Sequence, residues 1–553
     1  MTNSNFLKFI PAHARIVVEI NCGTGTTGAQ FKQINPHTHY IGIEPNVAAA
    51  TLAKTQLDRV IIAEPETLQI EDLEISAGSI DCLIYGDWLA GCSQPQSILS
   101  RHQSWLSPKG QVLAQFPNLQ YWRNLVNLIQ GHWFNPLTDL VPKFTLETIQ
   151  SLFAGCQLQL YECQTQGDNS SDFLQFQKLL EPLVQALGIN PQTFATQTRA
   201  QFYWVRAIND LTPPRRLFIQ TAVMAPTACD RPRVLEPDQL SNTIPGVRTV
   251  ATIKSSDCVP AFPGEEKVFI WQRTIMTYPA YLAPLKYLLQ NDYLIVAEID
   301  DNPIRRREYA DNYYLSYRGC HCVQTSTEPL AEFLRQYNPN VAVFANQLAY
   351  LPPPRTYDQN APITLFFGAL NREKDWQPII EPLNQILLAN PDKIQVKVIH
   401  DQQFFNRLKT RHKEFYPFCQ YEEYQAILHT CDIALLPLLP NPINNMKSDL
   451  KFLECAGHGV VVLASPTVYQ ASVMDEETGM LYETVPEFTS KLTQLIENFQ
   501  NRQKIAHNAY QWIRENRLLS QHYQKRSQWY LQMRDQLPQL NAQLKERLPE
   551  LFD

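Results

Sequence analysis

Short apolar runs recur along this chain in three series, and segments with helical spacing or turn residues separate them within each series. The runs of the first series are residues 16–20, 40–43, 59–63, 80–85 and 110–115. Those of the second are 268–271, 293–298, 321–325 and 341–344, and those of the third are 363–367, 394–399, 433–437 and 459–464. Such alternation is typical of parallel sheets whose two faces are covered by helices. The sequence therefore predicts an α/β protein with three sheet-centred units in tandem.

Proline-rich segments separate the three series. Pro213 and Pro214 cannot continue a helix or a central strand, so we predict a linker at residues 210–216. Prolines stay frequent up to Pro263, and we expect an irregular stretch there, with residues 233–235 as a candidate first strand of the next unit. Three more prolines at residues 352–354 mark a second break.

These breaks set the expected domain bounds. We expect a first domain over residues 1–209, a linker over 210–232, a lobe over 233–352, a second lobe over 353–530 and a helical tail over 531–553. Within the first domain, residues 173–187 have the spacing of an inserted helix, and residues 200–207 are predicted to close the sheet as a late strand.

Composition narrows the class of protein. Hydrophobic residues make up 44% and charged residues 18%, as in soluble globular proteins, and the net charge of −7 provides no basic footprint for nucleic acid. No apolar run approaches the roughly 18 residues that span a bilayer, and the N-terminus lacks the features of a signal peptide. We therefore expect a cytoplasmic protein. No polybasic block favours firm membrane attachment, whereas peripheral contact with a membrane stays open.

The 12 cysteines do not form a CxxC pair, and most lie inside apolar runs. They are interpreted as small buried hydrophobic residues of a reducing compartment. The nearest approach to a metal cluster is Cys320-His321-Cys322, which has too few ligands close by. We interpret it as core and expect no metal.

The first apolar run leads into a glycine-rich turn. Gly23, Gly25 and Gly28 have the spacing G-x-G-x-x-G between a predicted strand and a predicted helix. Glycine suits a backbone that must turn sharply and let a ligand come close. Glu44 ends the next strand, where an acid can hold both ribose hydroxyls. This pattern indicates a nucleoside-type cofactor, but it cannot separate NAD from S-adenosylmethionine.

The amino-acid sequences of these segments resemble those of class I S-adenosylmethionine-dependent methyltransferases. Residues 19–25, Glu-Ile-Asn-Cys-Gly-Thr-Gly, resemble their motif I, and residues 42–46, Gly-Ile-Glu-Pro-Asn, resemble their motif II. Residues 79–87 and 106–114 resemble later strands, so the likeness covers about residues 1–207. The resemblance implies S-adenosyl-L-methionine as the cofactor. It places Glu19, Gly23 and Gly25 along the methionine part, Glu44 at the ribose, and Glu64 or Glu66 near the adenine.

The segment also departs from that family. Asn21 stands where a glycine is commonest, and the loop at residues 135–144 is short with few charged groups. A methyl acceptor needs a base or an orienting polar group near the sulfonium. The candidates here are Tyr121, His132 and Asp139, and the alternative is a degenerate fold kept as a scaffold.

A second candidate site lies in the third series. Gly368 ends an apolar run and is followed by the basic residues Arg372 and Lys374, a turn that can cradle a diphosphate. Further on, Lys447, Lys451 and Glu454 are spaced i, i+4 and i+7, which predicts one shared face at the start of a helix over residues 448–457. Cations at a helix N-terminus favour a diphosphate, and the carboxylate can accept from sugar or ribose hydroxyls.

This arrangement resembles the donor site of GT-B glycosyltransferases, in particular the large retaining group often called GT4-like. Residues 447–459 and the apolar run after them match, with Glu454 at the acid that contacts the donor ribose. The other acid of that family would fall at Met446 and is missing. Residues 293–301, 323–330 and 341–346 resemble the first lobe, so the likeness covers about residues 216–530. The resemblance implies two Rossmann-like lobes, a UDP- or GDP-linked sugar donor, no bound metal and a retaining outcome.

The leading hypothesis is therefore a bifunctional transferase of polysaccharide synthesis. It moves a sugar from a nucleotide-sugar to a glycan or lipid-linked acceptor, and its N-terminal domain methylates the glycan. The alternative is a non-catalytic nucleotide-binding scaffold with a degenerate methyltransferase domain, and a third possibility is an NAD-binding enzyme at the N-terminus. The sequence does not indicate the sugar, the acceptor or the oligomeric state.

Overall fold

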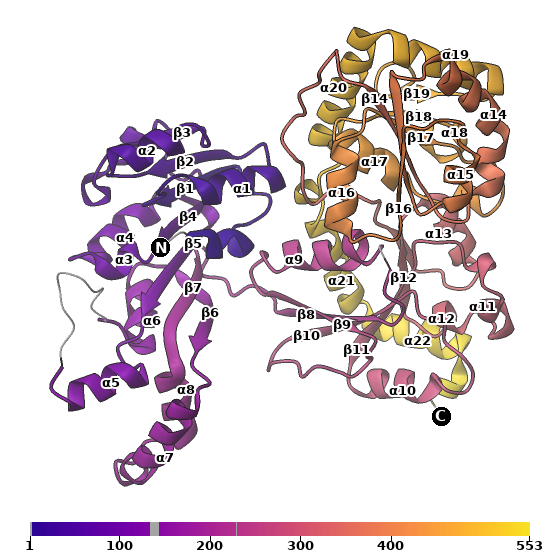
Figure 1. Ribbon diagram of the computed structural model, residues 1–553. Helices are drawn as coiled ribbons and strands as arrows, with labels where there is room; N and C mark the ends of the chain where they lie inside the picture. Colours follow the sequence, from indigo (N-terminus) through magenta and orange to yellow (C-terminus); the bar gives the residue numbers. More distant parts are fainter. Residues whose placement is uncertain (1–2, 133–142, 228, 553) are drawn as a thin grey trace. The chain divides into compact units, whose positions relative to one another are not determined.

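The computed structural model describes residues 3–132, 143–227 and 229–552 (Figure 1). The chain forms two compact units. The first contains the chain up to Arg216 together with Asn242–Val247, and the second contains Leu217–Ser241 and the chain from Arg248 onward. We describe each unit by itself.

The first unit is built on one sheet of seven strands in the order β3-β2-β1-β4-β5-β7-β6. Its strands are β1 (Ile16–Ile20), β2 (His39–Ile43), β3 (Arg59–Ile61), β4 (Ile80–Gly86), β5 (Leu106–Pro117), β6 (Gln159–Gly167) and β7 (Ala200–Ile208). The first five are parallel, and β7 runs antiparallel to both β5 and β6. All five predicted strands are confirmed, and β7 is the predicted closing strand.

Helices cover both faces of this sheet, and each face has its own core. Phe31, Tyr40 and Leu57 belong to the core on one face, and Leu99 and Phe153 belong to the core on the other. The longer helices are α1 (Thr26–Ile34), α2 (Val47–Ala53), α4 (Pro95–Gln103), α5 (Trp122–Ile129), α6 (Leu146–Gly155), α7 (Ser171–Ala186) and α8 (Pro191–Arg199). Helix α7 confirms the predicted inserted helix, and the Ser170 side chain caps it by accepting from the Phe173 N–H.

The strand order of the first unit reverses between β1 and β4. The chain moves outward from β1 through β2 to β3, and then crosses back to β4 on the other side of β1. In open α/β sheets, ligands bind outside the carboxyl ends of the strands at such a reversal. The glycine-rich turn after β1 lies at this point.

The second unit has two sheets, and the first of these has the strand order β13-β12-β11-β10-β8-β9. Its strands are β8 (Leu217–Val223), β9 (Val247–Ile253), β10 (Glu266–Gln272), β11 (Tyr293–Glu298), β12 (Cys322–Thr325) and β13 (Val341–Val343). The strands from β13 to β8 are parallel to their neighbours. The four strands predicted from the second series are confirmed, and we call this sheet with its helices the first lobe.

The stretch that we expected to be irregular contains regular elements instead. Strand β8 lies within the linker predicted at residues 210–232, and every one of its residues is buried. Residues 233–235, the candidate first strand, belong to the helical turn η4 (Arg231–Leu235). Pro213 and Pro214 end shortly before Leu217, so the linker between the two units is shorter than we predicted. The apolar run of β8 was overlooked because prolines are also frequent in the residues that follow it.

The other sheet of the second unit has the order β16-β15-β14-β17-β18-β19 and is parallel throughout. Its strands are β14 (Ile363–Gly368), β15 (Ile394–Ile399), β16 (Lys413–Tyr416), β17 (Ile433–Leu436), β18 (Val461–Ala464) and β19 (Met480–Leu481). Its helices include α14 (Glu373–Ala389), α16 (Tyr421–His429), α17 (Leu450–Gly457), α19 (Val485–Glu497) and α20 (Phe499–Asn516). The four strands predicted from the third series are confirmed, and we call this sheet with its helices the second lobe.

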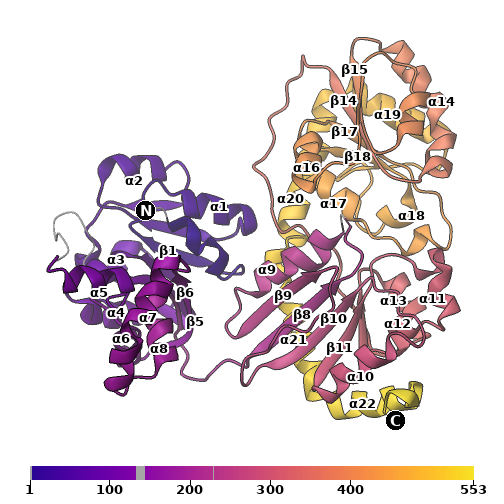
Figure 2. The ribbon, with the colours of Figure 1, turned by 60° about the horizontal axis from the view of Figure 1, so that its bottom comes forward.

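The chain returns from the second lobe to the first through α21 (Gln524–Asp535) and α22 (Leu537–Arg547). Leu544, Leu548 and Leu551 belong to the same buried cluster as Phe269 and Ile295 of the first-lobe sheet. Figures 1 and 2 both show α22 beside α10 (Leu282–Gln290) of the first lobe. The mainly helical structure predicted beyond residue 486 is confirmed.

Two further expectations can be compared with the fold. Cys320, His321 and Cys322 are fully buried, which confirms their interpretation as core. The imidazole of His321 accepts from the N–H of Ile295 and contacts the amide oxygen of Asn541 at 2.9 Å. Among the residues that the structure describes, no helix combines the length and the apolarity that crossing a bilayer would require.

Candidate nucleotide sites

The turn after β1 adopts a backbone that favours glycine. Asn21, Gly23 and Gly25 have φ values of 52°, 58° and 81°. A Cβ atom at Gly23 would meet no atom within 4 Å, whereas a Cβ at Gly28 would lie 2.4 Å from a methyl carbon of Leu57. Gly23 therefore leaves open space for a ligand, and Gly28 permits the close packing of α1.

Glu44 connects this turn to the end of β2. One carboxylate oxygen accepts from the N–H of Gly23 at 2.8 Å, and the other accepts from the N–H of Asn46 at 2.9 Å. These two bonds fix the carboxylate at the reversal of strand order. A carboxylate has about four acceptor positions, so each oxygen can accept one further hydrogen bond from a ligand hydroxyl.

The other acids assigned to this site are placed differently. Glu19 is fully buried within β1, and its carboxylate accepts from the hydroxyl of Tyr40 at 2.8 Å. Burial and the neighbouring Glu19 raise the pKa of Tyr40 well above its usual range, so Tyr40 stays a donor. Glu64 and Glu66 are exposed at the turn after β3. Glu44 is the acid whose carboxylate accepts from the backbone N–H of Gly23 in the turn.

Two of the three candidates for orienting a methyl acceptor, Tyr121 and His132, lie within the described residues. The Tyr121 hydroxyl donates to Asp168 at 3.0 Å, and the indole N–H of Trp122 donates to the same carboxylate. Burial and Asp168 raise the pKa of Tyr121. His132 is exposed, and Asp139 lies outside the described residues.

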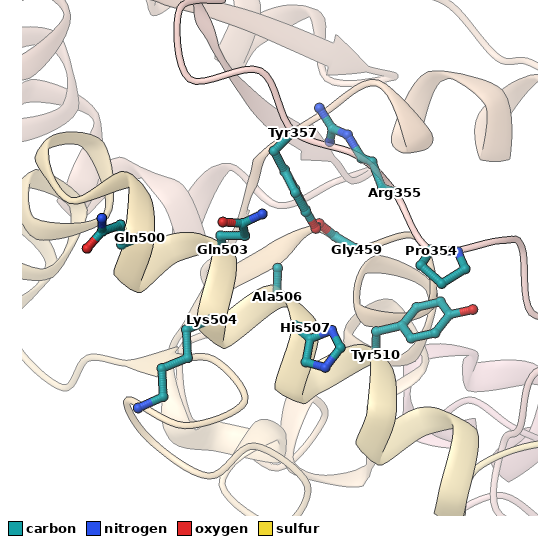
Figure 3. Close-up of a pocket in the computed structure, with 10 residues that line it drawn as sticks. All are labelled: Pro354, Arg355, Tyr357, Gly459, Gln500, Gln503, Lys504, Ala506, His507 and Tyr510. Carbon is teal, nitrogen blue, oxygen red and sulfur yellow. The ribbon is translucent and has the colours of Figure 1, made fainter.

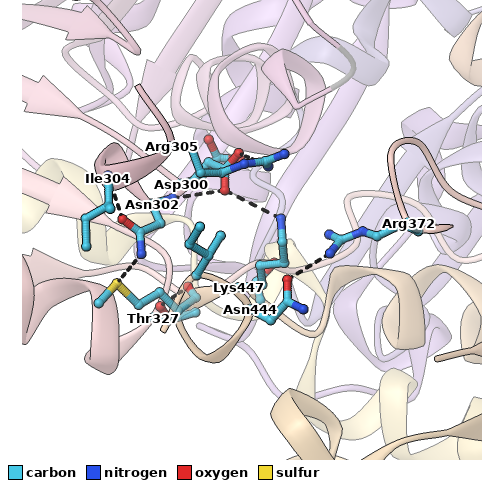
Figure 4. Close-up of polar contacts among 12 residues, drawn as sticks. Asp300, Asn302, Ile304, Arg305, Thr327, Arg372, Asn444 and Lys447 are labelled. Atoms are coloured by element: carbon cyan, nitrogen blue, oxygen red, sulfur yellow. Dashed lines mark hydrogen bonds and ion pairs between the residues drawn. The ribbon is translucent and has the colours of Figure 1, made fainter. Parts of the chain in front are cut away.

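A cavity of about 220 Å³ in the second unit collects side chains from both of its lobes. Arg372, Lys447 and Lys451 line it from the second lobe, and Asp300 and Asp301 line it from the first. Figure 4 shows Arg372, Lys447 and Asp300 around this space, with the dashed contacts that connect them to their neighbours. Arg273 of the first lobe also lines it, and a cavity with four cations suits an anionic ligand.

The cations differ in how they are held. Arg372 precedes α14 and donates to the amide oxygen of Asn444 at 2.8 Å and to Asp375 at 3.1 Å. Lys447 Nζ lies 3.5 Å from a carboxylate oxygen of Asp301. Burial lowers the pKa of Lys447, with Asp301 acting in the opposite direction. Both cations can therefore exchange a protein partner for a phosphate oxygen.

One of the predicted placements is wrong. Lys447 does not share a helix face with Lys451, because α17 begins only at Leu450 and Lys447 has an extended backbone. Both lysines still line the cavity, one from the preceding loop and one from the first turn of the helix. Lys374 is exposed on α14 and is not a lining residue, whereas Gly368 is one.

Glu454 lies deeper than expected. Its side chain is buried on α17 behind the cavity and accepts from the hydroxyl of Tyr424 at 2.8 Å. The ammonium group of Lys451 lies 5.5 Å from the centre of the same tyrosine ring. Burial raises the pKa of Glu454, and Lys451 and the tyrosine hydroxyls partly oppose that rise. Glu454 and Lys451 thus share Tyr424 as a neighbour.

The acidic wall of the cavity was not predicted, because the sequence analysis included residues 293–301 in the likeness to the first lobe without giving Asp300 or Asp301 a role in the site. Asp300 forms an ion pair with Arg273 at 2.8 Å, and Asp301 lies 3.0 Å from Arg305. One sequence signal could have found them. The pair follows a fully buried parallel strand, and the carboxyl ends of such strands face a ligand.

A second cavity, of about 310 Å³, lies in the second lobe beside α20 (Figure 3). It is lined by fewer cations, Arg355 and Lys504. Arg355 is paired with Asp432 at 3.0 Å, and the Tyr357 hydroxyl donates to the carbonyl of Gly459. Lys504 and His507 are exposed at its edge. The cavity lined by Lys447 and Lys451 is therefore the stronger candidate for an anionic ligand.

Two segments of the chain match known families. Residues 18–112 match the family described as methyltransferase domain, and residues 374–532 match the family described as glycosyl transferase-like. No curated protein matches this sequence. The methyltransferase match includes the turn after β1 and Glu44. The other match includes Lys447, Lys451 and Glu454, and Arg372 lies just before it.

Several solved structures are similar to parts of the chain. S. aureus TarM is 12% identical, with a TM-score of 0.35 over 48% of this chain and 54% of TarM, so the chain spans about half of its length. Anabaena Alr3699/HepE in complex with UDP-glucose is 13% identical, with a TM-score of 0.42 over 57% of this chain and 100% of the other. The plantazolicin methyltransferase BpumL in complex with SAH is 13% identical, with a TM-score of 0.26 over 38% of this chain and 86% of the other. TM-scores this low carry no functional argument.

Proposed function

We propose that this chain, which joins a Rossmann-like methyltransferase domain to a two-lobed, GT-B-like glycosyl transferase domain, transfers a sugar from a nucleotide-sugar to a glycan or a lipid-linked saccharide. One observation carries the proposal. Arg372, Lys447 and Lys451 come from separate loops and helices of the second lobe and line a single cavity that faces the first lobe.

The charge in this cavity suits the chemistry of sugar transfer. When the bond between the sugar and the diphosphate breaks, negative charge grows on the leaving phosphate oxygen. Cations fixed at that oxygen stabilise the transition state more than the ground state, and this difference accelerates the reaction. Lys447 and Lys451 are the groups we assign to this role, with Arg372 as a further diphosphate contact.

The remaining residues are assigned by position. Gly368 lines the cavity at the end of β14, where the backbone comes close to the ligand. Glu454 lies behind Lys451 and is assigned to the ribose hydroxyls, which places the nucleoside toward α16 and α17. Lys374 is left out because it is exposed and does not line the cavity.

We also propose that the first unit binds S-adenosyl-L-methionine. The open space at Gly23 and the doubly held carboxylate of Glu44 fit a ribose at the reversal of strand order. Glu19 supports the turn from within the core through Tyr40. When bound, this cofactor supplies an electrophilic methyl group. Methylation of the glycan is proposed from cofactor binding alone. Tyr121 adds no support, because its hydroxyl already donates to Asp168.

A binding screen with the full chain tests both proposals. Isothermal titration calorimetry would measure UDP, GDP, S-adenosylhomocysteine and NADH, each against the same preparation. We expect saturable binding of one nucleoside diphosphate and of S-adenosylhomocysteine. Failure of both diphosphates to bind would remove the glycosyltransferase proposal. Binding of NADH in place of S-adenosylhomocysteine would remove the methyltransferase proposal.

A matched pair of lysine variants localises the diphosphate. Lys451→Ala removes a cation from the proposed site, and Lys504→Ala removes an exposed lysine from the second cavity of the same lobe. Only Lys451→Ala is expected to weaken binding. Equal loss in the two variants would mean that the diphosphate binds by general attraction to the lobe.

A further inference from the structure

The cavity has an acidic wall opposite its cations, and this wall has no role in binding a diphosphate. Asp300 and Asp301 project into it from the loop after β11 of the first lobe. Carboxylates repel phosphate groups, so their presence weakens an anion site unless another part of the ligand uses them. A nucleotide-sugar has such a part, because its sugar is a neutral group with several hydroxyl donors.

We propose that Asp301 accepts hydrogen bonds from the hydroxyl groups of the donor sugar. In this proposal Asp301 pairs with Lys447 only in the absence of the donor, whose diphosphate replaces Asp301 as the partner of Lys447. The inference rests on the proposed glycosyltransferase function. It assigns sugar recognition to the first lobe, whereas the nucleoside and the diphosphate are assigned to the second.

The two neighbouring acids are not equivalent. The side chain of Asp300 is 8% exposed and its carboxylate is paired with Arg273 at 2.8 Å, which makes it an anchor for the loop. The side chain of Asp301 is 28% exposed, and its carboxylate contacts Lys447 at 3.5 Å and Arg305 at 3.0 Å. Asp301 is therefore the acid that a ligand in the cavity can reach.

The charge state of Asp301 suits an acceptor. The cations Lys447, Arg305 and Arg273 hold the pKa of Asp301 below its usual range, although burial acts in the opposite direction. The carboxylate therefore stays ionised and makes a strong acceptor for neutral hydroxyl groups. A general base needs a pKa closer to the working pH, so this environment does not favour proton abstraction.

Neighbouring contacts hold the loop against the segment that carries Lys447. The Asn302 side chain donates to the sulfur of Met446 at 3.0 Å and to the carbonyl of Pro442 at 3.2 Å. The Thr327 hydroxyl donates to the carbonyl of Met446 at 2.9 Å. Figure 4 shows these contacts beside Lys447. Asp301 therefore stays near Lys447 when the ion pair opens, within reach of a sugar attached to the diphosphate.

The exchange predicts that one substitution changes the relative affinity of two ligands. In Asp301→Asn, Lys447 loses its competing carboxylate, so a free nucleoside diphosphate binds more tightly. The same variant loses the charged acceptor for hydroxyl groups, so the sugar contributes less. The dissociation constant of the diphosphate, divided by that of its nucleotide-sugar, is expected to fall by about fivefold or more, since charged hydrogen bonds are roughly twice as strong as neutral ones.

Calorimetry on the full chain measures this ratio. The probes are UDP with UDP-glucose and UDP-N-acetylglucosamine, and GDP with GDP-mannose, using whichever diphosphate binds. The control is Asp311→Asn, which removes a carboxylate of the same lobe from an exposed ion pair with Arg307. Thermal unfolding of each variant checks that the second unit remains folded.

The outcomes separate this inference from the function it rests on. Binding of neither diphosphate to the unaltered chain would overturn the proposed function. Tighter diphosphate binding with a fallen ratio in Asp301→Asn, and no change in Asp311→Asn, would support the inference. An unchanged ratio would overturn it while leaving the function intact. The inference would also be overturned if every nucleotide-sugar of the panel bound the unaltered protein more weakly than the matching diphosphate.

Discussion

Arg233 and Glu298 form an ion pair from which water is completely excluded. The guanidinium Nε lies 2.7 Å from a carboxylate oxygen of Glu298, and neither side chain is exposed. Arg233 also donates to the carbonyl of Phe344 and to the side chain of Asn346. These contacts connect η4, β11 and the segment after β13, beneath the loop that carries Asp300 and Asp301.

Breaking this pair is expected to destabilise the second unit strongly. Arg233→Met leaves the Glu298 carboxylate buried without its cation, which costs about 3–5 kcal/mol for a pair of this kind. Chemical denaturation followed by tryptophan fluorescence measures the loss. Arg307→Met is the control, since its pair with Asp311 is exposed and contributes little. A loss in Arg233→Met no larger than in the control would contradict the prediction.

Asp238 makes the stability of the second unit depend on pH. Burial raises the pKa of Asp238 from 3.8 to about 7, and Arg526 only partly opposes the rise. One of its carboxylate oxygens is buried and has no hydrogen-bond partner among the described residues. A carboxyl group whose pKa is higher in the folded state stabilises the fold at low pH. That stabilisation is lost as the pH rises through the folded pKa.

We therefore expect Asp238→Asn to be more stable than the unaltered chain at pH 8. The difference should shrink by about 1.4 kcal/mol per pH unit between about pH 7 and pH 4, and vanish below that range. Thermal unfolding across this range measures it, with Asp311→Asn as the exposed control. A variant that is less stable than the unaltered chain at pH 8 would show that the carboxylate is favourably bound.

Glu44 should control binding in the first unit without controlling its fold. Glu44→Gln keeps one oxygen to accept from a backbone N–H but loses the charge and the second acceptor. Affinity for S-adenosylhomocysteine is expected to fall by about 1–3 kcal/mol through the loss of charged hydrogen bonds. Glu181→Gln, at an exposed position on α7 of the same unit, is the matched control. Retained affinity in Glu44→Gln, measured by calorimetry, would place the ribose contact elsewhere.

Protonation of Glu454 should weaken nucleoside-diphosphate binding at acidic pH. Its pKa is raised from 4.5 chiefly by burial, so the carboxylate is protonated at a pH where ordinary glutamates are still ionised. Affinity is expected to fall as the pH decreases toward 4.5, before carboxylates with ordinary pKa values titrate. Glu454→Gln should bind about 1–3 kcal/mol more weakly at neutral pH and lose most of this dependence. A variant with the same pH profile as the unaltered chain would exclude Glu454 from the ribose contact.

Sequence reasoning found the five parallel strands of the first unit and eight strands of the second from their apolar runs. It missed β8, although every residue of that strand is buried, because prolines lie on both sides of it. The other strands that it missed are less buried or shorter. Strand β6 is polar and half exposed at a sheet edge, β16 is partly exposed at another edge, and β19 has only two residues. An edge strand is held by one neighbour's hydrogen bonds, which leave no pattern in its own sequence.

The candidate sites could be predicted only where one segment carries the whole pattern. The turn after β1 and its Glu44 have a fixed spacing along the chain, and the structure places them in hydrogen-bond contact. The proximity of Asp301 and Lys447 depends on the packing of two lobes, which sequence spacing does not reveal. The error at Lys447 has another physical cause. Helical spacing was assumed from residue 447, but the helix is delayed until Leu450.

The return of α21 and α22 to the first lobe has a consequence for how the protein is made. Strands β8 to β13 leave the ribosome long before Leu544, Leu548 and Leu551, yet these leucines fill part of the same core. During synthesis, the apolar surface of the first lobe that these leucines cover therefore stays exposed until the whole second lobe has been translated. A gene fragment that ends before residue 524 would encode every strand of the first lobe and still yield one with an open core.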